Sequence, residues 1–186
     1  AQVAAISDDI AYNNHDLEDG LRAGLFTIKK FSSIPFISKI IKKHAKNIKS
    51  FRREIIVSQI VRDLINLMVV DVISTTHKNI KKSKLKSPKD IYRQDHLIVD
   101  FSKKMKETDK QIKDFLKYNM YNHNKVVVNT NRGKKIVKDL FIYLLKNPKK
   151  YINKELFIDK EETRVISDFI AGMTDRYAID LHRKII

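Results

Sequence analysis

The chain has 186 residues, of which 42% are hydrophobic and 32% charged, a balance typical of a globular protein with one buried core. The absence of Cys excludes disulfides and thiolate metal sites, and the lack of a signal peptide and of a bilayer-length apolar run predicts a cytoplasmic protein. A formal net charge of +16 indicates polyanionic partners such as the phosphates of a nucleotide or of nucleic acid, although an AT-rich genome would give the same Lys-rich composition.

The first half of the chain contains three predicted helices. They run from about Gln2 to Leu17, from Phe36 to Ala45 and from Phe51 to Ser74. Apolar residues at helical spacing mark the faces that we expect to be buried in the first and third helices. These residues are Val3, Ile6, Ile10, Leu17 and Leu21 in the first helix, and Ile56, Ile60, Leu64, Leu67, Val70 and Ile73 in the third. An exposed linker is predicted from Lys78 to Lys89.

The second half contains three further helices and two short segments of other character. The segment Leu97 to Phe101 is predicted to be strand-like or the start of a helix, and Val126 to Val128 to be extended. The helices are predicted from Asp109 to Tyr121, from Gly133 to Leu145 and from Lys160 to Lys184. With only four Gly and three Pro to interrupt these patterns, the predicted fold is all-α with at most a minor short-strand element.

Acidic residues are concentrated at the start of this basic chain: Asp8, Asp9, Asp16, Glu18 and Asp19. At about 100° per residue, Asp8, Tyr12 and Asp16 share an arc of roughly 80° opposite the apolar stripe. Periodicity alone fits the solvated face of a surface helix. However, like charges one turn apart destabilise a helix unless a cation compensates them, and Tyr12 is poorly placed if only water faces it. A site for a divalent metal or a substrate is the competing interpretation.

Two segments carry a resemblance to a known family. Residues 1–25, AQVAAISDDIAYNNHDLEDGLRAGL, and residues 168–185, DFIAGMTDRYAIDLHRKI, resemble the bacterial deoxyguanosinetriphosphate triphosphohydrolase-like proteins, a branch of the HD-domain phosphohydrolases. Residues 51–73 are similar to the long helix that follows the catalytic domain in that family, which is a less specific match. The resemblance implies an all-α HD-type architecture. Residues 1–30 would be the last metal and substrate helix of the catalytic domain, and residues 31–186 the C-terminal helical region.

The resemblance also implies an activity and a set of site residues. Members of the family bind divalent ions, here expected to be Mg²⁺ or Mn²⁺, through a His, a His-Asp pair and a later Asp. They cleave dNTPs to the deoxynucleoside and triphosphate, and homo-oligomers are expected. The later metal-binding Asp falls on Asp8, and the contacts to the deoxyribose fall on Tyr12 and Asp16. Arg53 is a weaker candidate for a phosphate contact, with a solvated Arg at a helix start as the alternative.

The metal site that this resemblance implies is incomplete. The family's first His and its His-Asp pair lie upstream of the segment that carries Asp8, and of the six His only His15 adjoins an Asp, at the sugar-side position. Because one carboxylate holds a divalent ion poorly, we expect a portion of an enzyme that is inactive alone. A second hypothesis follows from the charge: a basic helical module without catalysis that binds single-stranded DNA or a partner subunit.

Overall fold

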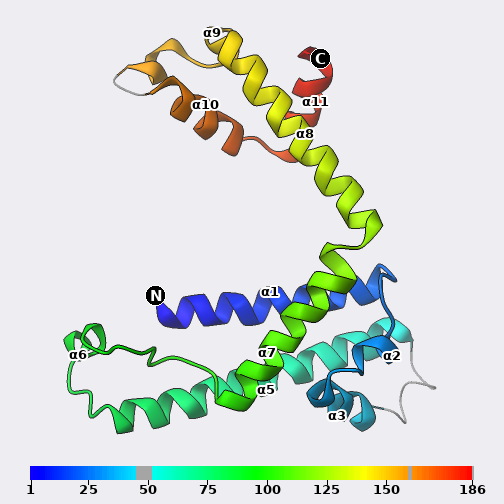
Figure 1. Cartoon of the computed structure of the whole chain (residues 1–186), viewed down its shortest axis with the longest axis vertical. Coiled ribbons are helices and arrows are strands. Elements are labelled where there is room, and N and C mark those ends of the chain that lie inside the picture. The colour runs from blue at the N-terminus through cyan, green and yellow to red at the C-terminus, as the bar shows by residue number, and fades with distance from the viewer. Residues whose placement is uncertain (45–51, 159–160, 186) are drawn as a thin grey trace. The chain divides into compact units, whose positions relative to one another are not determined.

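The computed structural model describes residues 1–44, 52–158 and 161–185, and its helices form two compact units (Figure 1). The first unit comprises residues Ala1–His123 and the second Asn124–Ile186. No β-strand occurs within these described ranges, which confirms the predicted all-α fold. Within the same ranges, no helix is long and apolar enough to cross a membrane.

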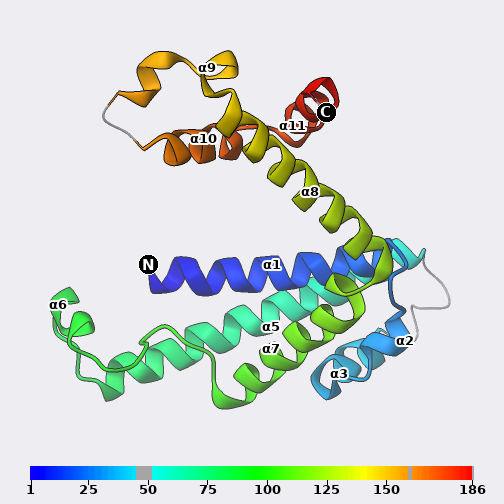
Figure 2. The same ribbon diagram turned by 45° about the horizontal axis from the view of Figure 1, so that its top comes forward.

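The first unit is built on two long helices that lie side by side (Figure 2). Its elements are α1 (Gln2–Arg22), α2 (Ile28–Phe31), α3 (Pro35–Lys43), α5 (Arg53–Lys82), α6 (Pro88–Tyr92), α7 (Lys103–Leu116) and the π-helical turn η1 (Lys117–Tyr121). Helix α1 packs along α5, while α7 packs against α1 and α3 against α5. Their shared core contains Leu17, Leu64 and Ile112, all fully buried.

The apolar pattern predicted for α5 is correct in its first half and wrong in its second. Ile56, Ile60 and Leu64 are buried as expected, but Leu67, Val70 and Ile73 are 41%, 54% and 53% exposed. The buried row continues through Met68 and Val72 instead. Each step of three residues turns the next side chain by about 60° about the helix axis, so the predicted row moves progressively away from the core. Steps of four residues stay closer to one line along the helix, and α1 packs against that line. Val3 at the start of α1 is also exposed rather than buried.

The ends of two predicted helices differ from the structure in the first unit. Helix α1 continues past Leu17 to Arg22, and α5 continues to Lys82, so the first residues of the predicted linker 78–89 are helical. Lys-rich sequence looks like a linker, but Lys is a good helix former, and the helix ends only where Ser83 caps it. The predicted helix ends at Ala45 and Phe51 lie outside the described residues.

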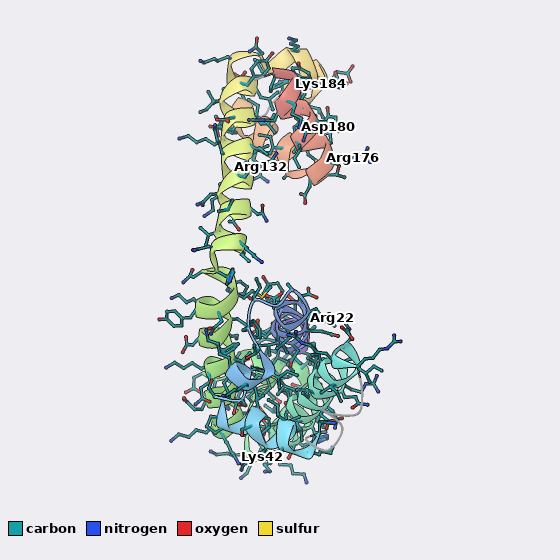
Figure 3. All side chains as sticks on the ribbon, turned by 90° about the vertical axis from the view of Figure 1, so that its right-hand side faces the viewer. Arg22, Lys42, Arg132, Arg176, Asp180 and Lys184 are labelled. Carbon is teal, nitrogen blue, oxygen red and sulfur yellow. The ribbon has the colours of Figure 1, made fainter. Side chains whose placement is uncertain are left out.

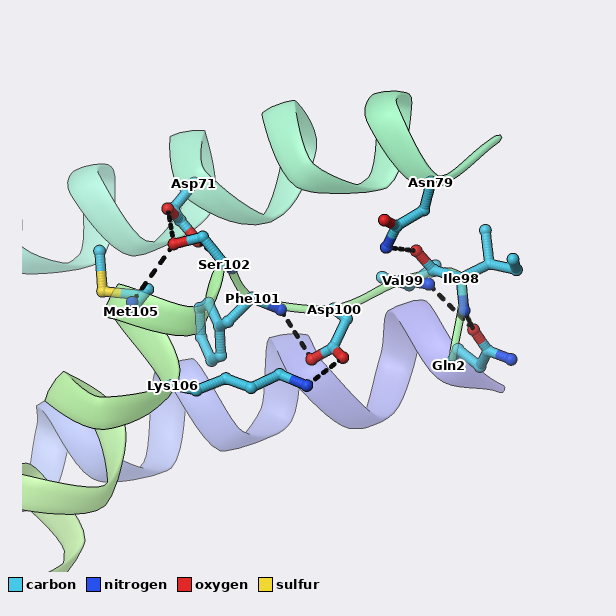
Figure 4. Close-up of polar contacts among 10 residues, drawn as sticks. All are labelled: Gln2, Asp71, Asn79, Ile98, Val99, Asp100, Phe101, Ser102, Met105 and Lys106. Carbon is cyan, nitrogen blue, oxygen red and sulfur yellow. Dashed lines mark hydrogen bonds and ion pairs between the residues drawn. The ribbon is translucent and has the colours of Figure 1, made fainter. Parts of the chain in front are cut away.

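An irregular segment leads into α7, and polar side chains of α1 and α5 hold it in place (Figure 4). The Gln2 side-chain oxygen accepts hydrogen bonds from the backbone N–H groups of Ile98 and Val99, both at 3.0 Å. On α5, the Asp71 carboxylate accepts from the backbone N–H and the hydroxyl of Ser102, at 2.8 and 2.7 Å. The segment Leu97–Phe101 is therefore neither a strand nor helical, and it ties the first turn of α1 to the rest of the unit.

The second unit is a small helical bundle around α8 (Asn124–Lys146). It also contains α9 (Pro148–Tyr151), the 3₁₀ turn η2 (Lys154–Phe157), α10 (Glu162–Ala171) and α11 (Asp175–Ile185). Leu140 and Leu144 of α8 are fully buried, Leu144 in a cluster with Ile166 of α10 and Leu140 in a cluster with Leu181 of α11.

Two predictions for the second unit are wrong. Val126–Val128, predicted to be extended, lies within the first turns of α8. Its β-branched residues have a low intrinsic preference for helix, but the amphipathic pattern that follows them overrides it. The helix predicted from Lys160 to Lys184 is two helices, because α10 ends at its C-cap Gly172 and α11 begins at Asp175. Lys160 itself lies outside the described residues.

Candidate functional site

One face of α1 carries the predicted site residues. Asp8 and Tyr12 are exposed, with Tyr12 60% exposed, and Asp16 is half-buried. The opposite face carries Ile10 and Leu17, which are buried in the core of the first unit. The site face therefore points away from the packing face, as the helical wheel requires.

Tyr121 joins this face from a distant part of the sequence. Its hydroxyl donates a short hydrogen bond to the Asp16 carboxylate. Partial burial raises the pKa of the Tyr121 hydroxyl, and the hydrogen bond to Asp16 and the proximity of Tyr12 raise it further. The phenol therefore stays protonated at neutral pH and acts as a donor to Asp16.

The π-helical turn η1 places Tyr121 at the site. It follows α7 without interruption, and its extra residue per turn shifts the direction of the side chains that follow. Tyr121 could not be predicted as a site residue, because it is 105 positions from Asp16 and no local pattern connects them. The only hint was its place at the end of the predicted helix 109–121.

The other acids of α1 have partners within the fold. Lys113 of α7 pairs with Asp9 at 3.1 Å and with Asp109 at 2.9 Å. Glu18 accepts hydrogen bonds from the Ser58 hydroxyl of α5, at 2.8 Å, and from Arg22, at 2.7 Å. The bond from Ser58 lowers the pKa of the Glu18 carboxyl, and Arg22 adds to this effect. Protein cations thus compensate part of the charge that α1 concentrates.

Asp8 has no such compensation. Among residues 1–44, 52–158 and 161–185, neither Asp8 nor Asp19 forms a hydrogen bond or ion pair through its carboxylate. Both lie on the exposed face, so Asp8 is free to bind a cation.

Two buried amides lie on the packing face of α1. The Asn13 side chain, 4% exposed, donates to Asp109 of α7 at 3.3 Å. The Asn14 side chain, fully buried, donates to the backbone carbonyl of Ile10 at 2.7 Å and contacts the sulfur of Met68 at 3.3 Å. The Asn13 bond joins α1 to α7, so a rotation of α1 would break it and leave this buried amide unsatisfied, whereas the Asn14 bond to Ile10 lies within α1 and the Asn14 side-chain oxygen has no partner among the described residues. The wheel position of both residues beside the apolar stripe was a sequence signal for this role.

Arg53 lies away from the site face. Its guanidinium donates to the backbone carbonyl of Leu21 at 3.0 Å. The same carbonyl in the last turn of α1 also accepts a hydrogen bond from the backbone N–H of Gly24 at 3.2 Å, so Arg53 is a second donor to it. Arg53 is exposed at the start of α5, and a phosphate contact by this residue stays a prediction.

The described residues do not make a complete site for a divalent ion. No group of three or more His, Cys, Asp or Glu side chains that could hold a metal occurs among them. His44 pairs with Asp63, His96 with Asp95 and His182 with Asp139. Asp8 fits as one oxygen ligand of Mg²⁺ or Mn²⁺, but such ions require several ligands.

The second unit carries basic side chains on two helices. Figure 3 shows Arg132 on α8, and Arg176 and Lys184 on α11. These Arg and Lys side chains are exposed or partly exposed. Such a surface suits a polyanion through charge alone, without a defined pocket.

Comparison with known proteins places these features in a family context. Residues 99–184 match the Phosphohydrolase-associated domain. Three relatives are each named deoxyguanosinetriphosphate triphosphohydrolase-like protein. The protein of Pelagibacter ubique is 47% identical over 185 residues, which are 100% of this chain and 50% of the relative. Those of Agrobacterium fabrum and Leptospira interrogans are 36% and 34% identical and cover 100% and 98% of this chain, but 47% and 49% of the relatives. The chain thus spans about half the length of the curated relatives it matches, their C-terminal half.

Proposed function

Given that this chain is a homologue of the deoxyguanosinetriphosphate triphosphohydrolase-like proteins, we propose that it forms the C-terminal part of a metal-dependent dNTP triphosphohydrolase. The reaction is hydrolysis of a dNTP to the deoxynucleoside and triphosphate. The observation that carries the proposal is the face of α1, where Asp8, Tyr12 and Asp16 lie one turn apart with Tyr121 bonded to Asp16. Homology to named relatives over the whole chain supports the same activity.

Each residue of this face has a proposed role. Asp8 is one ligand of Mg²⁺ or Mn²⁺, and its free carboxylate suits that role. Tyr12 and Asp16 contact the deoxyribose of the substrate, with Asp16 able to accept a hydrogen bond from a sugar hydroxyl. Tyr121 orients the Asp16 carboxylate through its hydroxyl. The remaining metal ligands come from another part of the protein, so this chain alone binds the ion weakly and does not hydrolyse dNTPs.

Calorimetry with Mn²⁺ and an assay of triphosphate release test this proposal on the purified chain. We expect weak Mn²⁺ binding that Asp8→Ala abolishes and no release of triphosphate from any dNTP. Asp19→Ala is the matched control, because Asp19 is an exposed acid on the same helix without a partner in the described structure, and it should leave Mn²⁺ binding unchanged. Robust triphosphate release by this chain alone, lost in Asp8→Ala, would overturn the argument from missing ligands.

The basic side chains of the second unit favour a second candidate function, the binding of single-stranded DNA. It is motivated by the net charge of +16 and by Arg132, Arg176 and Lys184. We expect binding that weakens steeply with salt and is unaffected by Asp8→Ala. No change in the mobility of labelled DNA near about 50 mM salt would contradict it, since several phosphate contacts give strong affinity at low salt.

Two further properties belong to the same proposal. A homo-oligomer is expected, and light scattering on the eluting protein measures its mass directly. A cytoplasmic location is proposed from the absence of Cys and the nucleotide substrate.

A further inference from the structure

Helix α5 exposes apolar side chains beside α1, although both helices are already buried against each other on their inner faces. Val69, Val70 and Ile73 are 39%, 54% and 53% exposed. Val69 lines a groove of about 450 Å³ between the two helices, which lie side by side in both views (Figures 1 and 2), and Ile73 follows one turn further along α5. The groove is lined by His15 and Glu18 of α1 and by residues of α5 that include Arg62, Ile65 and Val69.

This groove runs along the edge of the site face. His15 is seven residues from Asp8, close to two full helical turns, so the two side chains lie on nearly the same line of α1. Ala4 and Ala11, both exposed, lie on the same edge of the helix. Their small side chains let a neighbouring backbone come close to α1, as at other tightly packed helix pairs. An element in the groove would therefore lie next to Asp8.

The groove also contains a positive charge that has no carboxylate partner within the described structure. Arg62 is exposed, and its guanidinium pairs with no carboxylate among the described residues, since Glu18 is already bonded to Arg22 and Ser58. An occupant with apolar side chains and one acid would cover Ile65 and Val69 and pair with Arg62.

The relatives contain a part of the protein that could supply this occupant. The 185 matched residues are 50% of the Pelagibacter ubique protein, so a part of equal length lies outside the match. We propose that the groove between α1 and α5 receives an amphipathic helix from that part and so brings its side chains to Asp8. This inference rests on the proposed function, in which the remaining metal ligands come from elsewhere in the protein.

The absence of Cys from this chain allows a direct test by thiol labelling. Asn66→Cys places a thiol in the groove, and Tyr92→Cys places a control thiol on α6, at a position that is 89% exposed. Each variant is labelled in the 186-residue chain and in a hybrid that joins the preceding half of the Pelagibacter ubique protein to Ala1. Mass spectrometry of the labelled peptides separates these thiols from any in the added half.

We expect labelling at position 66 to slow by about tenfold or more in the hybrid, as for a site that must open before it reacts, and labelling at position 92 to stay the same. Val69→Asp together with Ile73→Asp should restore fast labelling at position 66. Equal labelling rates at position 66 in the two proteins, or equal slowing at both positions, would overturn the proposal. Slow labelling in the 186-residue chain that depends on its concentration would also overturn it, because a second copy would then fill the groove.

If the hybrid does not fold, the intact Pelagibacter ubique protein with Cys at the two aligned positions provides the same comparison. Triphosphate release by the hybrid, and its loss in Asp8→Ala, is measured separately. Release with an open groove leaves the proposed function standing and refutes this inference. A protected groove without triphosphate release supports this inference and refutes the proposed function.

Discussion

Gly20→Ala tests how tightly the end of α1 is packed against the core. A Cβ at position 20 would lie 2.3 and 2.7 Å from two ring carbons of Phe26. Phe26 is 3% exposed and packs edge-on against Phe115 with ring centroids 4.9 Å apart, so its ring has little room to retreat. Alanine gains about 1 kcal/mol of helix propensity over glycine, but overpacking a core costs about 1–3 kcal/mol. With contacts this short the cost is at the upper end, and we expect a net loss of about 2 kcal/mol.

Gly133→Ala is the matched control in the second unit. Gly133 is within α8, and no atom lies within 4 Å of the Cβ that the substitution would add. The same change should therefore stabilise the second unit by about 0.5–1 kcal/mol, through the lower flexibility of the unfolded chain. Hydrogen exchange measured on peptides from α1 and from α8 reports the two units separately. Unchanged or slower exchange in α1 of Gly20→Ala would refute the packing argument.

Three further substitutions test contacts of α1 and α5. Tyr121→Phe removes the donor to Asp16 and should cost about 1.5 kcal/mol, the lower end for a bond to a charged group because Tyr121 is 36% exposed; a free energy of urea unfolding equal to that of the unmodified chain would contradict this. The Ser58 bond lowers the pKa of Glu18 from 4.5, so the stabilisation by this bond is present above pH 4.5 and is lost as the pH falls through the folded pKa. Ser58→Ala should therefore reduce the free energy of unfolding more at neutral pH than in acid. Equal losses at both pH values, measured by urea unfolding, would contradict this role of Ser58. Asp71→Asn retains one acceptor for Ser102 but removes the charge, and should speed hydrogen exchange at the start of α7, whereas exchange as slow as in the unmodified chain would show that this contact is dispensable.

The sequence was sufficient to predict the helical class and the inner face of α1. Ile10, Leu17 and Leu21 repeat at helical spacing, and all three are buried. These positions depend only on the period of the helix and on the cost of exposing apolar side chains, which act locally. The start of α8 was not predictable in the same way. Val126–Val128 favours strand by propensity, and only the following turns of the helix determine its conformation.

The site on α1 shows a second limit of sequence reasoning. The order of Asp8, Tyr12 and Asp16 follows from the helical period, but the contacts that distinguish these acids come from other elements. Asp9 is paired by Lys113 and Glu18 by Ser58, at separations of 104 and 40 residues. Which acid remains free depends on how α7 and α5 pack on α1, and charge patterning along one helix contains no information about that packing.

The residues of α5 that were wrongly predicted to be buried form a second apolar face on this helix. Val70 and Ile73 continue the apolar pattern of Ile60 and Leu64, yet within the described structure more than half of each side chain is exposed. A helix that is apolar on two faces is usually buried on two faces, because exposed clusters of large apolar residues favour association. The pattern is therefore consistent with the proposal that a further element covers the exposed face of α5. The same helix that completes the core of the first unit provides the surface on which the rest of the catalytic site is proposed to assemble.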